Sequence, residues 1–333
     1  MMPPAGQHGS HTPGFTWPPV ISLNLSLSSA CGADCIYCPA DRGRRIPARN
    51  MPFETAKKAI DDASAHTDML RIQHVEIGEN GDAFINKHAL AILRYAKARI
   101  PNVTIGCYTN LQNLSGDTID SIVREGLLDS LGLNVDGASN LTFAAVKKID
   151  LRHVNQKLPL LLVAREKYAS QLKLLVNVLT LRDYIKATTL ALGRLPLKLQ
   201  NPSLIGLDDD FEQIREGVQR FLRPGDGFGR PAPFLWAERP GVDTSTLDYS
   251  QYSCSQLERV LAEAFIAPDG SWYACCYDSN NRLVVGNILE QPLEEIARGE
   301  RRRRLLEMLL QKKFGEIGAP CNTVNCCQAV DLP

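Results

Sequence analysis

Two patterns of hydrophobic and polar positions alternate along the first two hundred residues. Short apolar runs rich in Val, Ile and Leu predict strands, and stretches with apolar residues every three or four positions predict helices. The strands are predicted at 20–26, 72–78, 103–108, 130–135, 173–179 and 196–200. The helices are predicted near 53–66, 87–99, 116–126, 139–149, 155–168 and 182–192. This alternation favours an α/β fold with a parallel sheet, in which ligands bind at the carboxyl ends of the strands.

The pattern changes after residue 220. A stretch rich in Gly and Pro, without apolar periodicity, predicts a linker over 221–253. Beyond it, Asp269-Gly270 predicts a hairpin turn, followed by a strand toward "VVGNI" and a helix from about residue 291. We therefore expect a flexible tail at 1–18, a main domain at 19–220, the linker, and a small α+β domain at 254–333.

Composition and charge exclude several classes of protein. The 37 Lys and Arg residues balance 37 Asp and Glu residues, so no basic field indicates nucleic-acid binding. The one basic run, "RGERRRR" at 298–304, follows acidic residues and predicts a solvated helix face. No apolar run is long enough to span a membrane, and the first residues lack the pattern of a signal peptide. We expect a cytoplasmic protein, in which ten cysteines indicate metal or redox chemistry rather than disulfides.

Three of these cysteines, Cys31, Cys35 and Cys38, lie close together with the spacing C-x3-C-x2-C. A buried apolar role suits Cys107, within the run "VTIGCYTN", but not a triplet in a stretch typical of a turn. Structural zinc prefers two cysteine pairs and four ligands, whereas this triplet stands alone. A [4Fe–4S] cluster fits better, because three thiolates leave one iron open to a small chelating molecule.

The triplet, with the aromatic Tyr37 before its last cysteine, resembles the motif of the radical S-adenosylmethionine (SAM) superfamily. The resemblance implies a partial (β/α)6 TIM-like barrel and a cluster whose open iron binds the amino and carboxylate groups of SAM. It further implies that an electron from a flavodoxin- or ferredoxin-type donor cleaves SAM, and that the resulting 5′-deoxyadenosyl radical abstracts hydrogen from a substrate.

After the second predicted strand, "GENGDAFIN" resembles the family's Gly-Glu segment, which contacts the SAM ammonium. We prefer Gly81 and Asp82 to the alternative pair Gly78 and Glu79, because the residues that follow continue the family pattern. Asp stands here where the family has Glu, and a plain turn is the alternative reading.

Polar residues at the ends of later strands are further candidates for binding SAM or substrate. Asn134 and Asp136 are spaced two apart, so they share one face of a strand. The resemblance implies SAM-binding roles for Tyr37, Gly81, Asp82, Asn110, Asn134, Asp136 and Asn177. Gln200, Asn201 and Ser203 follow the sixth predicted strand and are candidates for contacts with adenine or substrate.

The C-terminal cysteines form a second constellation. Cys254, Gly270 and Cys275 fit the opening C-x9–15-G-x4-C of the SPASM and twitch domains, which hold auxiliary Fe–S clusters. The resemblance implies one auxiliary [4Fe–4S] cluster bound by Cys254, Cys275, Cys321 and either Cys326 or Cys327. Cys276 is predicted to be a bystander, because neighbouring residues on a strand point to opposite faces. A zinc site is the alternative for this segment.

An auxiliary cluster can accept the electron left on a substrate radical, which gives a net two-electron oxidation. The candidate bases for the accompanying proton are Asp82, Asp136 and Glu238, which the sequence does not rank. In "FLWAERPG", Trp236 and Arg239 are candidates for lining the substrate pocket, and a packed hinge is the alternative.

The length of the segment before the first predicted strand bears on the substrate class. About eighteen residues are too few for a leader-peptide-binding domain, so a sugar, cyclitol or amino-acid derivative is favoured over a short peptide. Two other hypotheses stay open. One is a radical SAM enzyme that epimerises, forms a bond or modifies a peptide, with Cys107 or Cys276 as a hydrogen-atom donor. The other is a non-catalytic Fe–S or zinc module.

Overall fold

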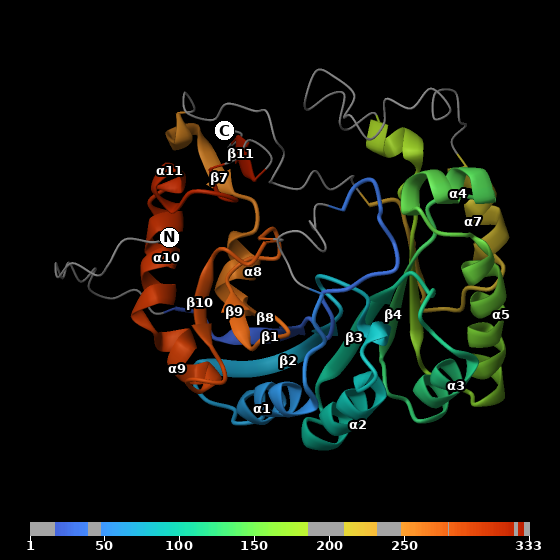
Figure 1. Cartoon of the computed structure of the whole chain (residues 1–333), viewed down its shortest axis with the longest axis horizontal. Coiled ribbons are helices and arrows are strands. Elements are labelled where there is room, and N and C mark those ends of the chain that lie inside the picture. Colours follow the sequence, from blue (N-terminus) through green and yellow to red (C-terminus); the bar gives the residue numbers. More distant parts are fainter. Residues whose placement is uncertain are drawn as a thin grey trace.

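A nine-stranded sheet organises the chain in the computed structural model, which describes residues 17–38, 48–185, 210–231, 248–278, 280–322 and 326–329. The strand order is β10-β9-β8-β1-β2-β3-β4-β5-β6 (Figure 1). All pairs from β8 through β1 to β6 are parallel, and the sheet is not closed into a barrel. This confirms the predicted fold class, an α/β partial barrel.

The first five parallel strands lie where the apolar runs predict them. They are β1 Val20–Leu25, β2 Leu70–Ile77, β3 Thr104–Thr109, β4 Ser130–Asn134 and β5 Lys173–Asn177. The sixth predicted strand, 196–200, lies outside the described residues, as does most of the helix predicted near 182–192.

Helices connect these strands and cover one face of the sheet (Figure 1). They are α1 Phe53–Ala63, α2 Ala89–Arg99, α3 Gly116–Arg124, α4 Asn140–Lys147 and α5 Arg152–Lys167, with a 3-10 turn η1 at Ala83–Ile85. The core is dominated by aliphatic side chains that alternate along the strands, such as Ile105 on β3 and Leu131 on β4. Burial of this face is the main source of stability, and the opposite, polar face is left for function.

The sixth parallel strand comes from a stretch that the sequence predicts to be linker. β6 Gly227–Gly229 pairs with β5, and α7 Phe211–Gln219 precedes it. The Phe228 ring packs 5.6 Å from the ring of Phe211 between their centroids. The prediction of a linker is wrong at this strand, which pairs with β5. The strand has only three residues, two of them glycine, so it shows no alternation of apolar and polar residues in the sequence.

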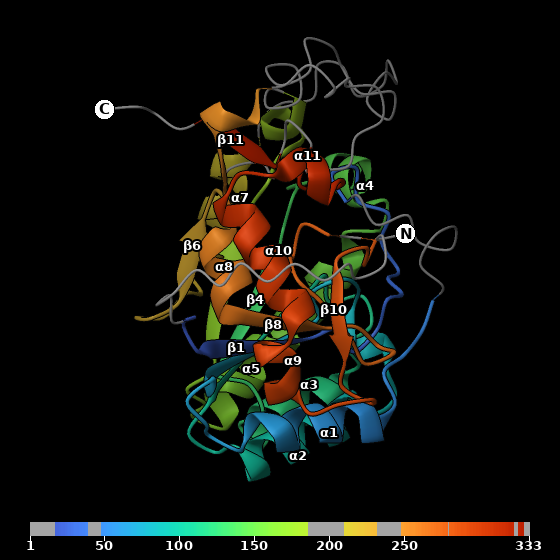
Figure 2. The same cartoon turned by 90° about the vertical axis from the view of Figure 1, so that its left-hand side faces the viewer.

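The C-terminal segment extends the same sheet. α8 Leu257–Ala262 leads into β8 Glu263–Ile266, which pairs with β1. β9 Ser271–Tyr273 and β10 Val284–Asn287 follow antiparallel, and Gly270 makes the predicted turn at φ +83°. Figure 2 shows the closing helices beside this edge. The other elements are η4 Tyr249–Gln251, β7 Tyr252–Cys254, α9 Leu293–Arg298, α10 Glu300–Leu310, α11 Phe314–Ile317 and β11 Cys327–Ala329, which pairs with β7.

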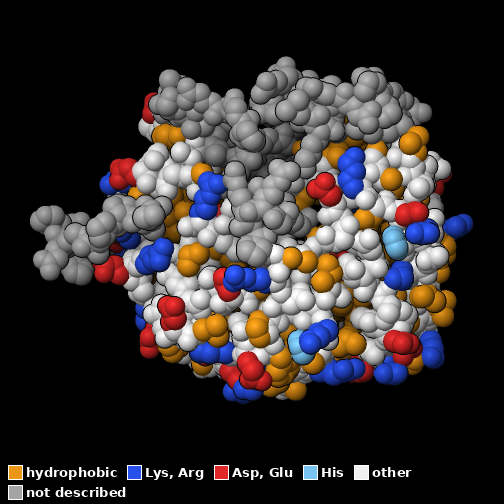
Figure 3. Space-filling model, in the orientation of Figure 1, with side chains coloured by type: hydrophobic (Ala, Val, Ile, Leu, Met, Phe, Trp, Pro, Cys, Tyr) orange, Lys and Arg blue, Asp and Glu red, His pale blue; other side chains and the backbone are white. Residues whose placement is uncertain are grey.

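Acidic and basic side chains are interspersed on the face shown in Figure 3. The basic run on α10 is only partly solvated, contrary to expectation. Arg302 is buried, donates to the backbone oxygens of Ala297 and Leu261, and lies 5.5 Å over the Trp272 ring. Its burial lowers the pKa of the guanidinium to about 10. Within the described part of the chain, no helix is both long and apolar enough to cross a membrane.

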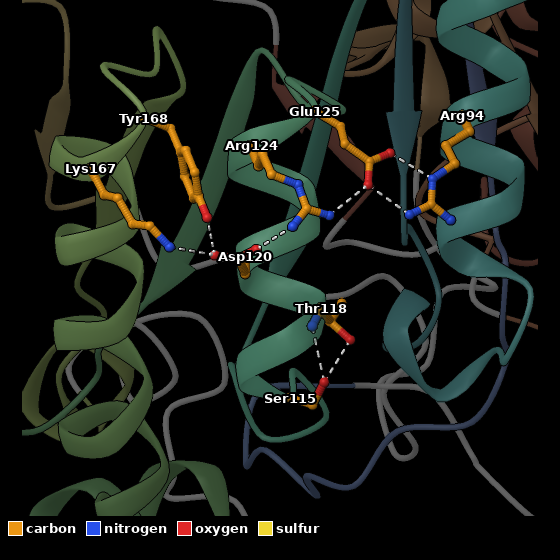
Figure 4. A network of polar contacts seen from close by, with 8 residues as sticks. All are labelled: Arg94, Ser115, Thr118, Asp120, Arg124, Glu125, Lys167 and Tyr168. Atoms are coloured by element: carbon orange, nitrogen blue, oxygen red, sulfur yellow. Dashed lines mark hydrogen bonds and ion pairs between the residues drawn. The ribbon is translucent and has the colours of Figure 1, made fainter.

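Ion pairs on the helical layer differ in their surroundings. Figure 4 shows an exposed network around α3, in which Arg94 binds Glu125 through two hydrogen bonds of 2.6 and 2.8 Å. Arg165, by contrast, pairs with Asp226 at 2.9 Å with both side chains almost fully buried. Asp226 also accepts the backbone N–H of Leu174, near the amino end of β5.

We predict that Arg165→Met lowers the free energy of unfolding by about 3–5 kcal/mol, because it leaves the Asp226 carboxylate buried without its cation. Arg94→Met, the control in the exposed network, is expected to leave stability nearly unchanged, since water screens that pair. Urea unfolding followed by circular dichroism measures both. An equal effect of the two substitutions would contradict the assignment of the buried pair as a stabilising contact.

Candidate functional site

The three N-terminal cysteines lie in the loop that follows β1, at the carboxyl edge of the sheet. The backbone N–H of Cys38 donates to the Cys35 carbonyl at 3.0 Å, which folds these two residues into one turn. Asn110, directly after β3, donates its side-chain N–H to the Cys31 sulfur at 3.7 Å. A Cβ at Gly32 would lie 1.9 Å from the side-chain oxygen of Gln112, so the loop closely approaches the segment that follows β3.

A buried ion pair lies behind this loop. Lys147, at the end of α4, contacts the Asp136 carboxylate at 2.9 Å, and both side chains are almost fully buried. Tyr37 donates its hydroxyl hydrogen to Asp136 at 2.8 Å and accepts a hydrogen bond from Lys147 at 2.5 Å. Burial lowers the pKa of Lys147, but Asp136 and Cys35 outweigh it, so the net pKa is raised and the ammonium keeps its charge.

The Cys35 thiol lies in a buried and charged environment. Burial raises its pKa, the Lys147 ammonium lowers it, and Cys38, Asp136 and Cys31 raise it further as neighbouring negative charges. Among the described residues, no three Cys, His, Asp or Glu side chains are placed to hold one metal ion. The assignment of the triad to a cluster therefore depends on the spacing of its cysteines in the sequence.

Gly81 and Asp82 lie against the cysteine loop, as the preferred reading of "GENGDAFIN" requires. The Asp82 N–H donates to the Ala30 carbonyl at 2.8 Å, and a Cβ at Gly81 would collide with the backbone of Ser28. The Asp82 carboxylate is buried and accepts hydrogen bonds from the Phe84 N–H and the Asn113 side chain. Its side chain is thus a structural acceptor, and the backbone of this pair faces the cysteine loop.

Asp136 is held by contacts inside the protein. Besides Lys147 and Tyr37, its buried carboxylate accepts the Leu179 N–H at 2.9 Å. Its predicted role toward SAM or as a base stays a prediction. Asn134 and Asn177 are register partners on β4 and β5, and both are partly exposed at the carboxyl edge. Their predicted roles toward SAM stay predictions.

The polar face of the sheet carries an acidic site that the sequence analysis missed. Glu76 lies on β2 between Asn24 on β1 and Gly106 on β3, and its carboxylate rests over Gly106. The Tyr108 ring rests in the same way over Gly132 of β4. The Oε1 atom of Glu76 is buried without a hydrogen-bond partner among the described residues.

The ionisation of Glu76 reflects these surroundings. Burial raises its pKa to about 8, the neighbouring carboxylate of Glu79 adds to the rise, and Arg259 opposes it. A carboxyl group that exchanges a proton near neutral pH is suited to acid–base chemistry. The signal in the sequence was a single charged residue inside the otherwise apolar end of a strand, "HVEI".

Arg259 on α8 connects this acidic site to the C-terminal cysteines. It binds Glu263 through two 2.9 Å hydrogen bonds and lies 3.8 Å from Glu79. Its third contact is with the sulfur of Cys276, at 2.9 Å. Because Cys276 follows Cys275 directly, one guanidinium spans the distance from the polar face of the sheet to the proposed auxiliary ligands.

The C-terminal cysteines differ in how far their positions are defined. β7 and β11 pair so that Cys254 is the register partner of Cys327, and Cys275, Cys321 and Cys326 are all buried. Their predicted role as ligands of one auxiliary cluster stays a prediction. β9 ends at Tyr273, so Cys275 and Cys276 lie in a turn and not on a strand. The argument that made Cys276 a bystander is therefore wrong, although its sulfur is engaged by Arg259. The nine cysteines with described side chains form no disulfide.

Of the other predicted residues, one faces away from the site and six lie outside the described part of the chain. Cys107 alternates with Gly106 and Tyr108 on β3, so it points to the helix-covered face and is buried. It does not face the polar side of the sheet, which contradicts its candidacy as a hydrogen-atom donor. Gln200, Asn201, Ser203, Trp236, Glu238 and Arg239 lie outside the described residues.

Comparison with protein families agrees with this geometry. The model of the radical SAM superfamily matches residues 25–160, which begin at the last residue of β1 and include the cysteine loop and β2 to β4. This chain belongs to the radical SAM superfamily. The SPASM model, an iron–sulfur cluster-binding domain, matches residues 254–327. The chain is therefore a radical SAM enzyme that uses SAM and a [4Fe–4S] cluster, with an auxiliary-cluster domain of SPASM type.

Solved structures share this fold at low sequence identity. BtrN in complex with AdoMet and 2-DOIA superposes with a TM-score of 0.53 at 14% identity, over 95% of this chain and 96% of BtrN. The enzyme anSMEcpe with bound AdoMet gives 0.55 at 14% identity, over 86% and 83%. Streptococcus suis SuiB bound to its precursor peptide SuiA gives 0.53 at 14% identity, over 85% and 65%. None of the curated proteins compared matches the chain.

We predict that replacing Cys31, Cys35 or Cys38 with Ala abolishes reductive cleavage of SAM by this radical SAM enzyme, because each removes a thiolate from the cluster. The measurement is anaerobic formation of 5′-deoxyadenosine with dithionite, together with the iron content. Cys107→Ala is the matched control, since that buried thiol faces the helices. Undiminished cleavage in any of the three variants would show that the triad does not hold the cluster.

Proposed function

We propose that this enzyme is an oxidoreductase that removes two hydrogens from a small polar substrate bound on the polar face of the sheet. The observation that carries the proposal is the contact of Arg259 with both the acidic site and Cys276. When bound, SAM and its [4Fe–4S] cluster supply the radical that takes one hydrogen atom, and the auxiliary cluster supplies an electron acceptor.

We propose that Glu76 accepts the proton that the substrate loses. After the first hydrogen atom has left, oxidation is completed by loss of one proton and one electron from the substrate. The Glu76 carboxylate takes the proton, and the electron leaves toward the domain that holds Cys275, Cys254 and Cys321. The balance is one SAM, one donor electron and one substrate consumed. The products are methionine, 5′-deoxyadenosine, a substrate lacking two hydrogens, one proton taken up by Glu76 and one electron passed to the auxiliary cluster. A flavodoxin- or ferredoxin-type protein is the proposed donor.

Arg259 has a separate role in this scheme. Its two hydrogen bonds to Glu263 fix the guanidinium plane, and Asn24 holds the same carboxylate at 3.1 Å. The Arg259 charge then lies beside Glu79 and only partly opposes the rise in the pKa of Glu76. Glu76 therefore keeps a proton that it can exchange near neutral pH. We propose that Glu79, Tyr108 and Asn177 orient hydroxyl or amino groups of a sugar, cyclitol or amino-acid derivative.

A screen of candidate substrates tests the proposal. The reconstituted enzyme is incubated with SAM, dithionite and a panel of aminocyclitols, sugars, amino acids and short peptides. A substrate is recognised by increased 5′-deoxyadenosine and by a product two mass units lighter. A product of unchanged mass would indicate epimerisation, and an added SAM fragment would indicate bond formation. Either would overturn the oxidative assignment.

We predict that Cys275→Ala or Cys321→Ala preserves SAM cleavage but blocks product formation, because the substrate radical then has no electron acceptor. Both activities are followed in one assay by chromatography of 5′-deoxyadenosine and product. The matched control is Cys107→Ala, which removes a buried thiol outside both constellations. Full turnover in the Cys275 and Cys321 variants would rule out the electron-acceptor role.

We predict that Glu76→Gln lowers kcat by a factor of about 10² to 10⁴, the usual contribution of a general base. In the wild type, kcat should rise with pH and level off above about pH 8, because Glu76 must lose its proton before it can accept one. The Gln variant should lack this rise. A wild-type profile that is flat between pH 6 and 9 would exclude Glu76 as the base.

Stability provides a test of the same pKa that needs no substrate. The folded state keeps a proton on Glu76 up to about pH 8, whereas the unfolded chain loses it near 4.5. The free energy of unfolding should therefore fall as the pH rises through this window. Glu76→Gln should remove that part of the dependence, as measured by urea unfolding at pH 5 and pH 8.

A further inference from the structure

The ion pair of Lys147 and Asp136 is built into the layer directly behind the cysteine loop. Both side chains are almost fully buried, and the two charges are 2.9 Å apart. Tyr37 bonds to both of them and lies between the second and third cysteines of the motif. The Lys147 ammonium also lies 5.2 Å over the Tyr37 ring. Through Tyr37, the segment that carries the cysteines therefore contacts one buried positive charge and one buried negative charge.

Backbone and aromatic contacts hold the same segment against α4. The Ile36 N–H donates to the carbonyl of Val146, the residue before Lys147, at 2.9 Å. The Ile36 carbonyl accepts the hydroxyl of Tyr184 at 3.0 Å, and Ile36, Val146 and Tyr184 share a small hydrophobic cluster. Two hydrogen bonds and a shared hydrophobic cluster therefore hold the end of α4 that carries Lys147 against the cysteine loop.

Both charges reach the cysteine loop through Tyr37. The Lys147 ammonium and the Asp136 carboxylate each hydrogen-bond to the Tyr37 hydroxyl, and Tyr37 stands between Cys35 and Cys38. The pair is neutral as a whole, so the removal of one member leaves a single buried charge beside this loop. A net positive potential in a buried region stabilises an added electron, because Coulomb energies are large where water is excluded.

We propose that Lys147 is a positioning residue that raises the reduction potential of the SAM-binding cluster, and that Asp136 limits this effect while holding Lys147 and Tyr37 in place. Charge close to an Fe–S cluster is one of the factors that set its potential. The proposal does not depend on the identity of the substrate. It assigns Asp136 and Tyr37 to the electrostatics of the cluster, in place of the contacts with SAM expected for them.

A purely structural pair would behave differently. If Lys147 and Asp136 only held the fold together, then loss of either would disturb the cluster in the same direction, toward lower occupancy and broader spectra. An electrostatic role instead predicts opposite shifts. Removal of the cation should make the cluster harder to reduce, and removal of the anion should make it easier to reduce.

The test is a redox titration of the reconstituted full-length protein, followed by electron paramagnetic resonance. The signal that changes when SAM is added identifies the N-terminal cluster and separates it from the auxiliary cluster. We expect Lys147→Gln, which keeps hydrogen-bonding capacity, to shift the midpoint potential downward. Asp136→Asn should shift it upward, and Lys147→Arg should leave it close to the wild-type value.

Two controls keep the result interpretable. Arg165→Met breaks an equally buried ion pair at the amino end of β5, the opposite edge of the sheet, and should not move the potential. Thermal unfolding shows whether each variant is folded, and if Lys147→Gln does not fold, the direction of the Asp136→Asn shift decides alone. Shifts of the same sign in both variants, or no shift in a folded variant that holds its cluster, would overturn the proposal.

Discussion

The pairing of β1 with strands on both of its sides is the constraint on which the arrangement of this protein depends. β1 hydrogen-bonds to β2 within the partial barrel and to β8 of the C-terminal segment. Because both neighbours are parallel to it, the segments that follow β1, β2 and β8 leave the sheet at the same edge. The cysteine loop comes from β1, and β8 leads through a hairpin into the antiparallel β9, after which Cys275 follows. Backbone hydrogen bonds thus fix the position of Cys275 relative to the N-terminal cysteines.

The sheet carries two kinds of buried charged group: an ion pair at its carboxyl edge and a single carboxyl group on its polar face. Lys147 and Asp136 neutralise each other and accept or donate further hydrogen bonds, so both can stay ionised without water. Among the described residues no cation pairs directly with Glu76, and its pKa rises to about 8 because burial and Glu79 disfavour the charged form more than Arg259 favours it. The first arrangement provides a permanent field at the cysteines. The second provides a group that gains and loses a proton, which is why we assign the two sites different functions.

Part of this could be predicted from the sequence. The strands from 20 to 179 were found because each is an apolar run whose pattern does not depend on distant residues, and Cys31, Cys35 and Cys38 were found because their ligand spacing is local. β6 was missed because two glycines around Phe228 give no pattern, and its pairing is tertiary. The partner of Asp136 could not be predicted either, since Lys147 is reached only through the packing of α4 behind the cysteine loop.

Two glycines on the polar face decide how the larger side chains lie on it. Gly106 and Gly132 carry no side chains, and the carboxylate of Glu76 and the ring of Tyr108 lie in the space that this leaves. A larger residue at either glycine would displace these groups from the sheet. The two glycines therefore let Glu76 lie flat on the sheet, on the side where Arg259 contacts both Glu79 and Cys276. If the substrate binds on this face, as we propose, it lies between the proposed proton acceptor and the domain of the proposed electron acceptor, which is the arrangement that a two-electron oxidation needs.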